Sequence, residues 1–386
     1  MNKTHISTLY LLFLVVDLLV FPKLLFSTPI SIILLPIFLI LSVKFNKLNV
    51  IIFFLLISIV FSSVFFSALS YSDYVSENTK RGMQLGFIFL FLLYDFNKID
   101  LNLIFSSIRR LLFFYYLFVL VLIYFFYFKS ELYVSFMTVV FPESIPMLLV
   151  NLQSQRFSFH FTDPNAFGYM IVITLAFLLS MKLHTREFVF FVICALIIIL
   201  TTQSRGAMIS CGLVFLSYFL FIIKSKRLKI YFIFMLIVII SIIYFIWGEY
   251  LDIFFSVMNQ RSEIEASMGA GVGGGRIESW FYFINNINYN PFFGSGYMLQ
   301  RDGELYRPHS DFIRLNLSYG ILIYFLFSYI FIGFRKKHIM LFFAFLIPFF
   351  INTIIDDYRL FATFIIFYSL IRTAECTDFS EKRSLS

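Results

Sequence analysis

The sequence predicts an all-α integral membrane protein with about twelve transmembrane helices and one large polar loop. Of its 386 residues, 60% are hydrophobic and only 13% are charged, whereas a soluble domain is about half apolar and about a quarter charged. The mean hydropathy is +0.90. Apolar runs long enough to cross a hydrocarbon core of about 30 Å recur along the chain. We therefore expect residues 1–386 to form a single polytopic membrane domain.

Each predicted span is an apolar run bounded by charged or turn-forming residues. The predicted spans are 5–22, 25–43, 49–70, 82–95, 110–129, 164–183, 187–203, 206–224, 229–248, 312–333, 339–354 and 358–371. Residues 130–160 are mixed in character and contain Pro142 and Pro146, which indicates an interfacial or re-entrant segment. The first run carries Asp17 and lacks a small-residue cleavage site, so we expect a retained helix and no cleaved signal peptide.

The distribution of Lys and Arg predicts how the spans are oriented. Outside the large loop, 18 of these residues fall on the side of the N-terminus and 7 on the other side. Every loop on the first side carries at least two positive charges. Because positive charge accumulates in cytoplasmic loops, we expect both termini, including a tail at 372–386, to lie in the cytoplasm. The large loop is then extracytoplasmic.

The large loop is predicted at residues 249–311, between the ninth and tenth spans. It is too long and too polar to hide within the hydrocarbon core. It also contains the glycine-rich stretch 269–275. Five arginines lie within it or just past its end: Arg261, Arg276, Arg301, Arg307 and Arg314. We expect a membrane protein with one such loop to carry out its chemistry there.

The cysteines and the charge distribution exclude several other classes of site. Cys194 and Cys211 lie inside apolar runs, and Cys376 lies in the polar tail. Since no Cys or His ligand spacing is present, the sequence predicts neither a disulfide framework nor a metal site. The net charge of +8 is spread over short loops. That pattern orients helices, whereas nucleic-acid binding needs a contiguous basic face, so we expect no nucleic-acid partner.

Two short motifs stand at the predicted outer ends of spans. In the first, Asp163 is a candidate N-cap and Pro164 a first helical residue, which by themselves indicate only a helix start. Helix capping does not explain Arg156 and Asn165 at the same membrane face. The second motif is the turn 201–206, which leaves Arg205 at the boundary between two apolar runs. An interfacial arginine that anchors the helix is an equally good explanation of that residue alone.

The third motif is spread over the large loop. It contains Arg276 and Trp280, the segment 291–296 with Gly294 and Gly296, and His309 just before the tenth span. Turn glycines and a solvated histidine would be the ordinary explanation of these residues. Three motifs that converge on one membrane face argue against that explanation.

Together these residues resemble the O-antigen polymerase/ligase family, the Wzy-type and WaaL-type integral membrane glycosyltransferases. The resemblance runs from about Arg156 to Gly320. Its matching pieces are Arg-x6-Asp-Pro-Asn, Ser-Arg-Gly, Arg-x3-Trp followed by Pro-x2-Gly-x-Gly, and His-Ser-x9-Gly. The ligase pattern has a small residue or Tyr three positions after the last glycine, where this chain has Ile323. This departure favours a polymerase over a ligase.

The resemblance implies a GT-C-like helical fold in the bacterial cytoplasmic (inner) membrane. It also implies an undecaprenyl-pyrophosphate-linked oligosaccharide as the glycan donor, with no cofactor and no metal. The polymerase would join repeat units of a surface polysaccharide, whereas the ligase would move finished glycan to lipid A core during lipopolysaccharide biosynthesis. Membrane lipid, a chain-length regulator and a flippase are the further partners that we expect.

The residue types suit this chemistry. Cleavage of a sugar–phosphate bond develops negative charge on the leaving pyrophosphate, which Arg205 and Arg276 could stabilise as catalytic residues without a metal. His309 could act as the base, or orient the acceptor hydroxyl, near neutral pH. The expected substrate-binding residues are Arg156, Asp163, Asn165, Trp280, Gly294, Gly296 and Arg314. His160, flanked by Phe159 and Phe161, is expected to matter less than His309.

Two other function classes would leave different signals in the sequence. A lipid-linked oligosaccharide flippase would carry charges inside its spans and often internal repeats. Here Asp17 is the clearest charge within a span, and the sequence shows no repeat. A membrane scaffold protein would not need clustered arginines.

Overall fold

The computed structural model describes most of the chain outside the large loop. Its described residues are 3–21, 30–42, 47–70, 75–161, 163–181, 183–224, short pieces between 226 and 306, 310–324, 328, 338–352, 354–355 and 357–384. Most of the predicted span 229–248 and of the loop 249–311 lies outside them.

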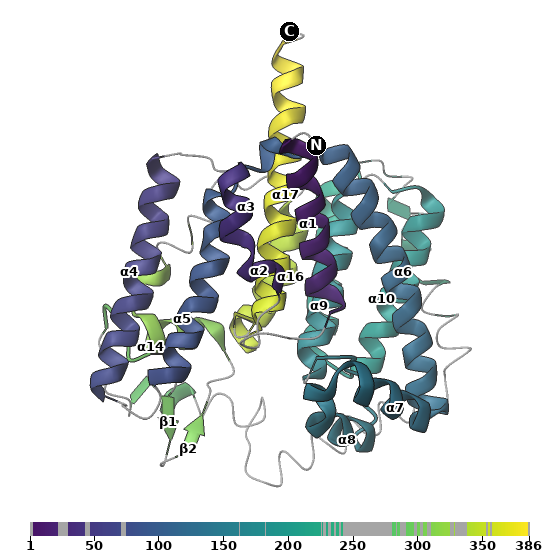
Figure 1. Cartoon of the computed structure of the whole chain (residues 1–386). Coiled ribbons are helices and arrows are strands. Elements are labelled where there is room, and N and C mark those ends of the chain that lie inside the picture. The colour runs from purple at the N-terminus through teal and green to yellow at the C-terminus, as the bar shows by residue number, and fades with distance from the viewer. Residues whose placement is uncertain are drawn as a thin grey trace.

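The described residues form a helical bundle with one small hairpin (Figure 1). In chain order its first half contains α1 (Lys3–Leu19), α2 (Ile30–Ile33), α3 (Leu35–Ser42), α4 (Lys47–Ser70), α5 (Val75–Phe89), η2 (Leu90–Leu93), η3 (Phe96–Lys98), α6 (Leu101–Phe128), α7 (Ser130–Val140), η4 (Pro142–Ser144) and α8 (Ile145–Gln153). Its second half contains α9 (Pro164–Ser180), α10 (Thr185–Thr202), α11 (Arg205–Ser217), η5 (Tyr218–Ile222), β1 (Leu299–Arg301), β2 (Glu304–Tyr306), α14 (Asp311–Tyr319), α16 (His338–Ile351) and α17 (Tyr358–Ser384).

Four of the described helices are long and apolar enough to cross a membrane. They are Lys47–Phe66, Leu101–Phe128, Thr185–Thr202 and Arg205–Ile222. Three apolar helices of 10–17 residues, Ser130–Val140, Pro164–Ser180 and His338–Ile351, accompany them. The predicted all-α membrane architecture is therefore confirmed, with the antiparallel pair β1–β2 as a small addition. Twelve spans remain a prediction.

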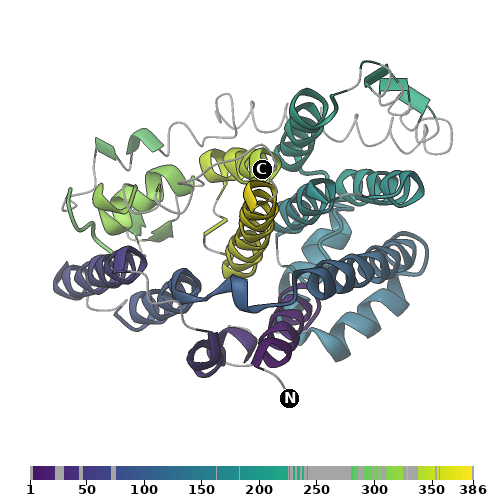
Figure 2. The same cartoon turned by 90° about the horizontal axis from the view of Figure 1, so that it is seen from above.

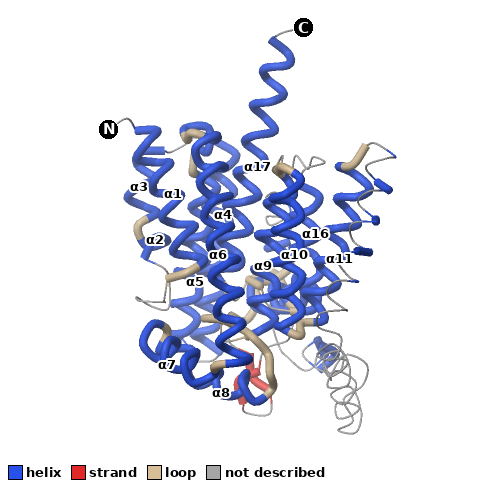
Figure 3. Tube along the Cα trace, turned by 90° about the vertical axis from the view of Figure 1, so that its right-hand side faces the viewer, coloured by secondary structure: helices blue, strands red, loops and turns tan. Residues whose placement is uncertain are grey.

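Both termini lie at one end of the bundle, and the hairpin, α7 and α8 lie at the other (Figures 1 and 3). We call these the termini end and the loop end. The hairpin belongs to the predicted large loop, most of which lies outside the described residues, so the placement of the whole loop opposite the termini remains a prediction. Which end faces the cytoplasm remains a prediction from the Lys and Arg distribution.

The centre of the bundle is formed by α9 and α17. Every residue of α9 from Phe167 to Ser180 is buried, as expected of a helix that is apolar on all sides. Seen from above, α17 stands in the middle of the bundle (Figure 2). The rings of Phe177 and Phe367 stack between these two helices with centroids 4.0 Å apart.

The segment 130–160 folds as α7, η4 and α8 beneath the loop end of α6 (Figure 1). With 11 and 9 residues, α7 and α8 are too short to cross a membrane. One face of α7 buries Tyr133 and Met137, while Leu132 and Val139 are 57% and 82% exposed. Such exposed apolar residues suit a helix at the lipid interface and agree with the predicted interfacial segment.

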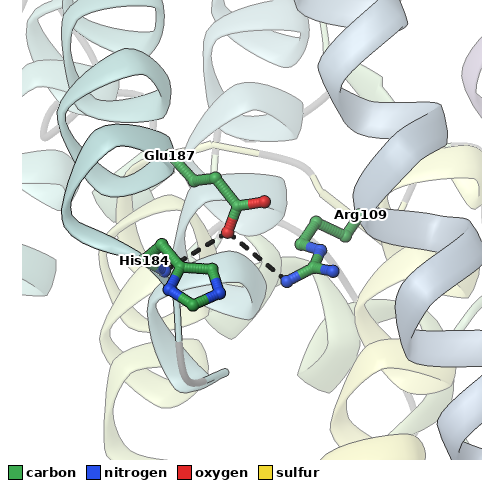
Figure 4. Close-up of polar contacts among 3 residues, drawn as sticks. All are labelled: Arg109, His184 and Glu187. Atoms are coloured by element: carbon green, nitrogen blue, oxygen red, sulfur yellow. Dashed lines mark hydrogen bonds and ion pairs between the residues drawn. The ribbon is translucent and has the colours of Figure 1, made fainter.

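Polar side-chain contacts join helices at the termini end. Arg109 Nη1 of α6 lies 3.4 Å from Glu187 Oε2 of α10, and the same oxygen accepts the backbone N–H of His184 (Figure 4). Because both side chains are one-third exposed, we expect a contribution of only about 0.2–1 kcal/mol. A polar contact between His338 Nδ1 and Glu375 Oε2, 3.3 Å apart, joins α16 to α17.

The predicted span 312–333 is interrupted. It begins as α14, but α14 ends at Gly320, whose φ is +75°. Helical residues resume at 322. A left-handed residue at a helix end is a common stop signal, and glycine adopts this conformation without a steric penalty.

Asp17 is explained by local structure. It is 3% exposed on α1, and its Oδ2 accepts the backbone N–H of Ser31 in the short helix α2. An acidic side chain at a helix N-terminus satisfies a donor that has no partner within the helix. This charge therefore stabilises the α1–α2 contact.

Candidate functional site

The first motif forms a connected polar cluster at the loop end, which we call the Arg156 cluster (Arg156, Asp163 and Asn165). Asp163 Oδ1 accepts both the backbone and the side-chain N–H of Asn165, each at 2.9 Å, and so caps α9. Arg156 Nη2 donates to Asn165 Oδ1 at 3.1 Å. The N-cap predicted from Asp-Pro is confirmed. The same carboxylate orients Asn165, which in turn binds Arg156, and helix capping alone did not explain these two residues.

The second motif lies against the first. Arg156 Nε donates to the carbonyl of Thr202 at 3.3 Å, and the N–H of Phe157 donates to the carbonyl of Thr201 at 2.9 Å. The chain reverses through Gln203 (φ +52°), after which Ser204 caps α11 by accepting the N–H of Ala207. Arg205 is the first residue of α11 and is exposed. An exposed arginine at a helix N-terminus attracts anions through both its charge and the helix dipole.

The Pro-x2-Gly-x-Gly segment packs against the end of α14. The N–H groups of Ser295 and Gly296 donate to the carbonyls of Leu317 and Ser318 at 2.8 and 3.1 Å. Gly294 has φ +71°, and a Cβ there would overlap the Ser318 backbone. In the same way, a Cβ on Gly320 would overlap the Phe292 backbone. Close contact between the two backbones thus requires glycine at both positions.

The start of α14, directly after His309, is fixed by buried polar contacts. Ser310 caps the helix, and the backbone N–H of Asp311 donates to the carbonyl of Asn352 at 2.8 Å. Asp311 Oδ2 accepts the N–H of Ile355 at 2.9 Å. Arg314 Nη1 lies 3.9 Å from Asp311 Oδ1, and the two side chains are 1% and 0% exposed. Arg314 is therefore part of a buried ion pair.

The motifs meet at the loop end of α16. A Cβ at Gly206, in the second motif, would come within 2.9 Å of Ile351 Cδ1. Asn352, the next residue, holds the N-terminus of α14 through Asp311. Ile351 thus lies beside the Ser-Arg-Gly turn, and the adjacent Asn352 binds Asp311, which follows His309 and Ser310 in the chain. This agrees with the predicted convergence of the motifs on one face.

The candidate site residues fall into two groups. His309 and Arg276 lie outside the described residues, so their predicted roles remain predictions. Trp280 is half-buried in a short helical piece. The remaining candidates are described: Arg156, Asp163, Asn165, Arg205, Gly294, Gly296 and Arg314. His160 is 4% exposed, and its ring stacks on Phe141 with centroids 5.1 Å apart, so it belongs to an aromatic cluster.

Sequence reasoning gave no role to several residues at this end. Asn352 binds the start of α14, and the hydroxyl of Ser63 on α4 donates to the Ser318 carbonyl. Arg359, at the second position of α17, is 1% exposed. In the sequence, Arg359 is recognisable only as a charged residue beside an apolar run. That pattern does not show that its side chain is buried. Among the described residues, no three His, Cys, Asp or Glu side chains gather as a metal site would require.

Comparison with known proteins gives one match. The family model described as O-antigen ligase matches residues 190–328, which include the Ser-Arg-Gly turn, the whole of the predicted large loop and α14. No curated protein and no solved structure matches the chain. The match covers the second and third motifs, and the Arg156 cluster lies before its first residue. Over residues 190–328 the chain is therefore similar to the O-antigen ligase family, which supports the resemblance seen in the sequence.

Proposed function

We propose that this protein polymerises the repeat units of an O-antigen or a related surface polysaccharide. In this proposal it takes glycan from an undecaprenyl-pyrophosphate-linked donor and transfers it to a sugar hydroxyl at the outer face of the cytoplasmic membrane. The observation that supports it best is the meeting of the Arg156 cluster, the Arg205 turn and the start of α14 around the loop end of α16. The family match over residues 190–328 supports a lipid-linked glycan substrate.

The proposed reaction replaces one bond at the anomeric carbon with another. The oxygen of the acceptor hydroxyl attacks the anomeric carbon of the donor glycan, and the bond from that carbon to the pyrophosphate oxygen breaks. The hydroxyl proton passes to His309, and undecaprenyl pyrophosphate leaves with the bonding electrons. Neither a redox step nor a nucleotide sugar is needed.

The arginines in this proposal neutralise charge on the leaving group. Arg205 is exposed at the N-terminus of α11, where the helix dipole adds to its own positive charge. Arg276 is the second proposed contact to the pyrophosphate. Arg156 is held by the Thr202 carbonyl and by Asn165, so it is preorganised. Preorganised cations stabilise developing charge without the cost of reorientation during the reaction.

A ligase is the second candidate, because the matching family model is described as O-antigen ligase. It would use the same donor and the same site, but its acceptor would be lipid A core. Ile323, which is 1% exposed, stands where the ligase pattern has a small residue or Tyr. This residue favours the polymerase.

Deletion of the gene in its host, followed by electrophoresis of the surface glycan, separates the two candidates. Loss of a polymerase leaves lipid A core capped with a single repeat unit. Loss of a ligase leaves lipid A core bare while polymer accumulates on undecaprenyl pyrophosphate. Complementation with the wild-type gene should restore long chains. Unchanged glycan length and attachment in the deletion strain would refute both candidates.

A further inference from the structure

A buried arginine outside the family motifs lies at the loop end. Arg359 is 1% exposed and, with Arg314, is among the largest fully buried side chains. Its Nη2 donates to the carbonyl of Phe21, at the end of α1, at 2.6 Å. Its Nε and Nη1 have no hydrogen-bond partner among the described residues. A buried guanidinium whose donors are not all satisfied destabilises the protein unless an anion or other acceptor joins it.

Two tyrosines lie near this guanidinium. Tyr115 of α6 is 3% exposed, its hydroxyl has no partner among the described residues, and the charge of Arg359 acts on it. The Tyr358 side chain is hydrogen-bonded to Arg359. Guanidinium N–H groups can only donate hydrogen bonds, and the Tyr115 phenol has a proton to donate. A group with several acceptor oxygens, such as a phosphate, would satisfy this set of donors.

The position of Arg359 connects it to the candidate site. The segment that leads into α17 contains Ile355, whose N–H binds Asp311 at the start of α14. On the other side, the Tyr115 ring lies 6.5 Å, between centroids, from Phe159, in the loop that also carries Arg156. The loop-end termini of α1, α16 and α17 stop short of the level that α4, α5 and α6 reach (Figure 1). Neighbours of Arg359 thus contact both the start of α14 and the loop that carries Arg156.

We propose that Arg359 and Tyr115 form a binding site for the phosphate of a polyprenyl phosphate or pyrophosphate, and that Arg359 is a further donor-binding residue. This inference rests on the proposed function. Arginine suits the site because its planar fork binds phosphate oxygens in pairs. Since the guanidinium is covered, the anion reaches it when the hydrogen bond to the Phe21 carbonyl gives way.

Binding of geranylgeranyl pyrophosphate to the purified full-length protein in detergent tests the proposal. Inorganic pyrophosphate and geranylgeraniol are the two further probes, one without the lipid and one without the anion. The most informative variant is Tyr115→Phe, because removal of a buried hydroxyl without a partner should leave thermal stability unchanged or raise it. Tyr133→Phe is its matched control, since Tyr133 is 0% exposed on α7 and its hydroxyl also has no described partner.

We expect Tyr115→Phe to weaken binding of geranylgeranyl pyrophosphate about 3- to 10-fold, and Arg359→Lys about 10- to 100-fold, as for charge-assisted hydrogen bonds. Tyr133→Phe should bind as the wild type does. If inorganic pyrophosphate binds in an Arg359-dependent way and geranylgeranyl pyrophosphate does not, Arg359 forms an anion site for a free anion, and the lipid part of the proposal is wrong. Wild-type affinity in both Tyr115→Phe and Arg359→Lys, or equal affinity for geranylgeraniol, would overturn the proposal.

The inference and the proposed function can fail separately. Arg359-dependent binding in a protein whose deletion leaves glycan length and attachment unchanged would refute the function and keep the site. Loss of long chains on deletion, with binding that is insensitive to Arg359 and Tyr115, would refute the site and keep the function. If Arg359 only joins α17 to α1, Arg359→Lys should lower thermal stability while Tyr115→Phe leaves affinity unchanged.

Discussion

Gly294→Ala should destabilise the loop end strongly. Gly294 has φ +71°, and a left-handed conformation costs an alanine about 1–2 kcal/mol. The added Cβ would also overlap the carbonyl carbon and oxygen of Ser318, and such overpacking costs about 1–3 kcal/mol. The sum is about 2–5 kcal/mol. With an unfolding entropy of about 2.1 cal/mol/K per residue, the chain of 386 residues would melt about 3–6 °C lower.

The assay is thermal unfolding of the purified protein in detergent, followed by the loss of the monodisperse peak in size-exclusion chromatography. Gly212→Ala is the matched control, because a Cβ at this exposed position in α11 would meet nothing within 4 Å. Alanine within a helix should leave stability unchanged or raise it by about 0.5–1 kcal/mol. Equal melting temperatures for Gly294→Ala and Gly212→Ala would show that the close contact between Gly294 and α14 does not exist.

Further predictions concern the site and the topology. Arg156→Lys should lower glycan transfer at least 10-fold with normal protein abundance, because lysine cannot bind the Thr202 carbonyl and Asn165 together. The control Arg109→Lys, at the termini end, should leave glycan transfer unchanged. Asp163→Ala should cost about 1 kcal/mol of stability, and Asp163→Ser should recover most of it. His309→Ala should lower transfer about 10²–10⁴-fold, whereas His184→Ala, exposed at the termini end, should be neutral; equal losses would return His309 to an ordinary loop histidine. Reporter fusions should read external within 260–305 and cytoplasmic after Lys47, Lys229 and Lys337, and a cytoplasmic loop would contradict the proposed mechanism.

Local signals in the sequence predicted part of the site. Asp-Pro marks a helix start from two adjacent residues, and α9 begins there with Asp163 as its cap. The apolar runs predicted the helices, and Pro142 and Pro146 predicted a break into the short helices α7 and α8. Such features depend on neighbours in sequence, so no knowledge of packing is needed.

The remaining features depend on contacts between distant residues. Gly294 and Gly320 are required because two backbones touch, and glycine alone does not indicate such a contact. Arg314 and Arg359 resemble the other loop-end arginines in sequence, but both are 1% exposed while Arg205 is exposed. The binding of Asp311 to Asn352 and Ile355 joins segments about forty residues apart, which local patterns cannot predict.

Transfer by the purified protein in proteoliposomes tests the central claim most directly. The substrate is a synthetic polyprenyl-pyrophosphate-linked repeat unit, supplied with EDTA and without nucleotide sugar. We predict a ladder of elongated glycans, with one polyprenyl pyrophosphate released for each bond formed, and loss of both products in the Arg205→Ala, Arg276→Ala double variant. No elongation by the wild-type protein, or an equal rate in the double variant, would contradict the account.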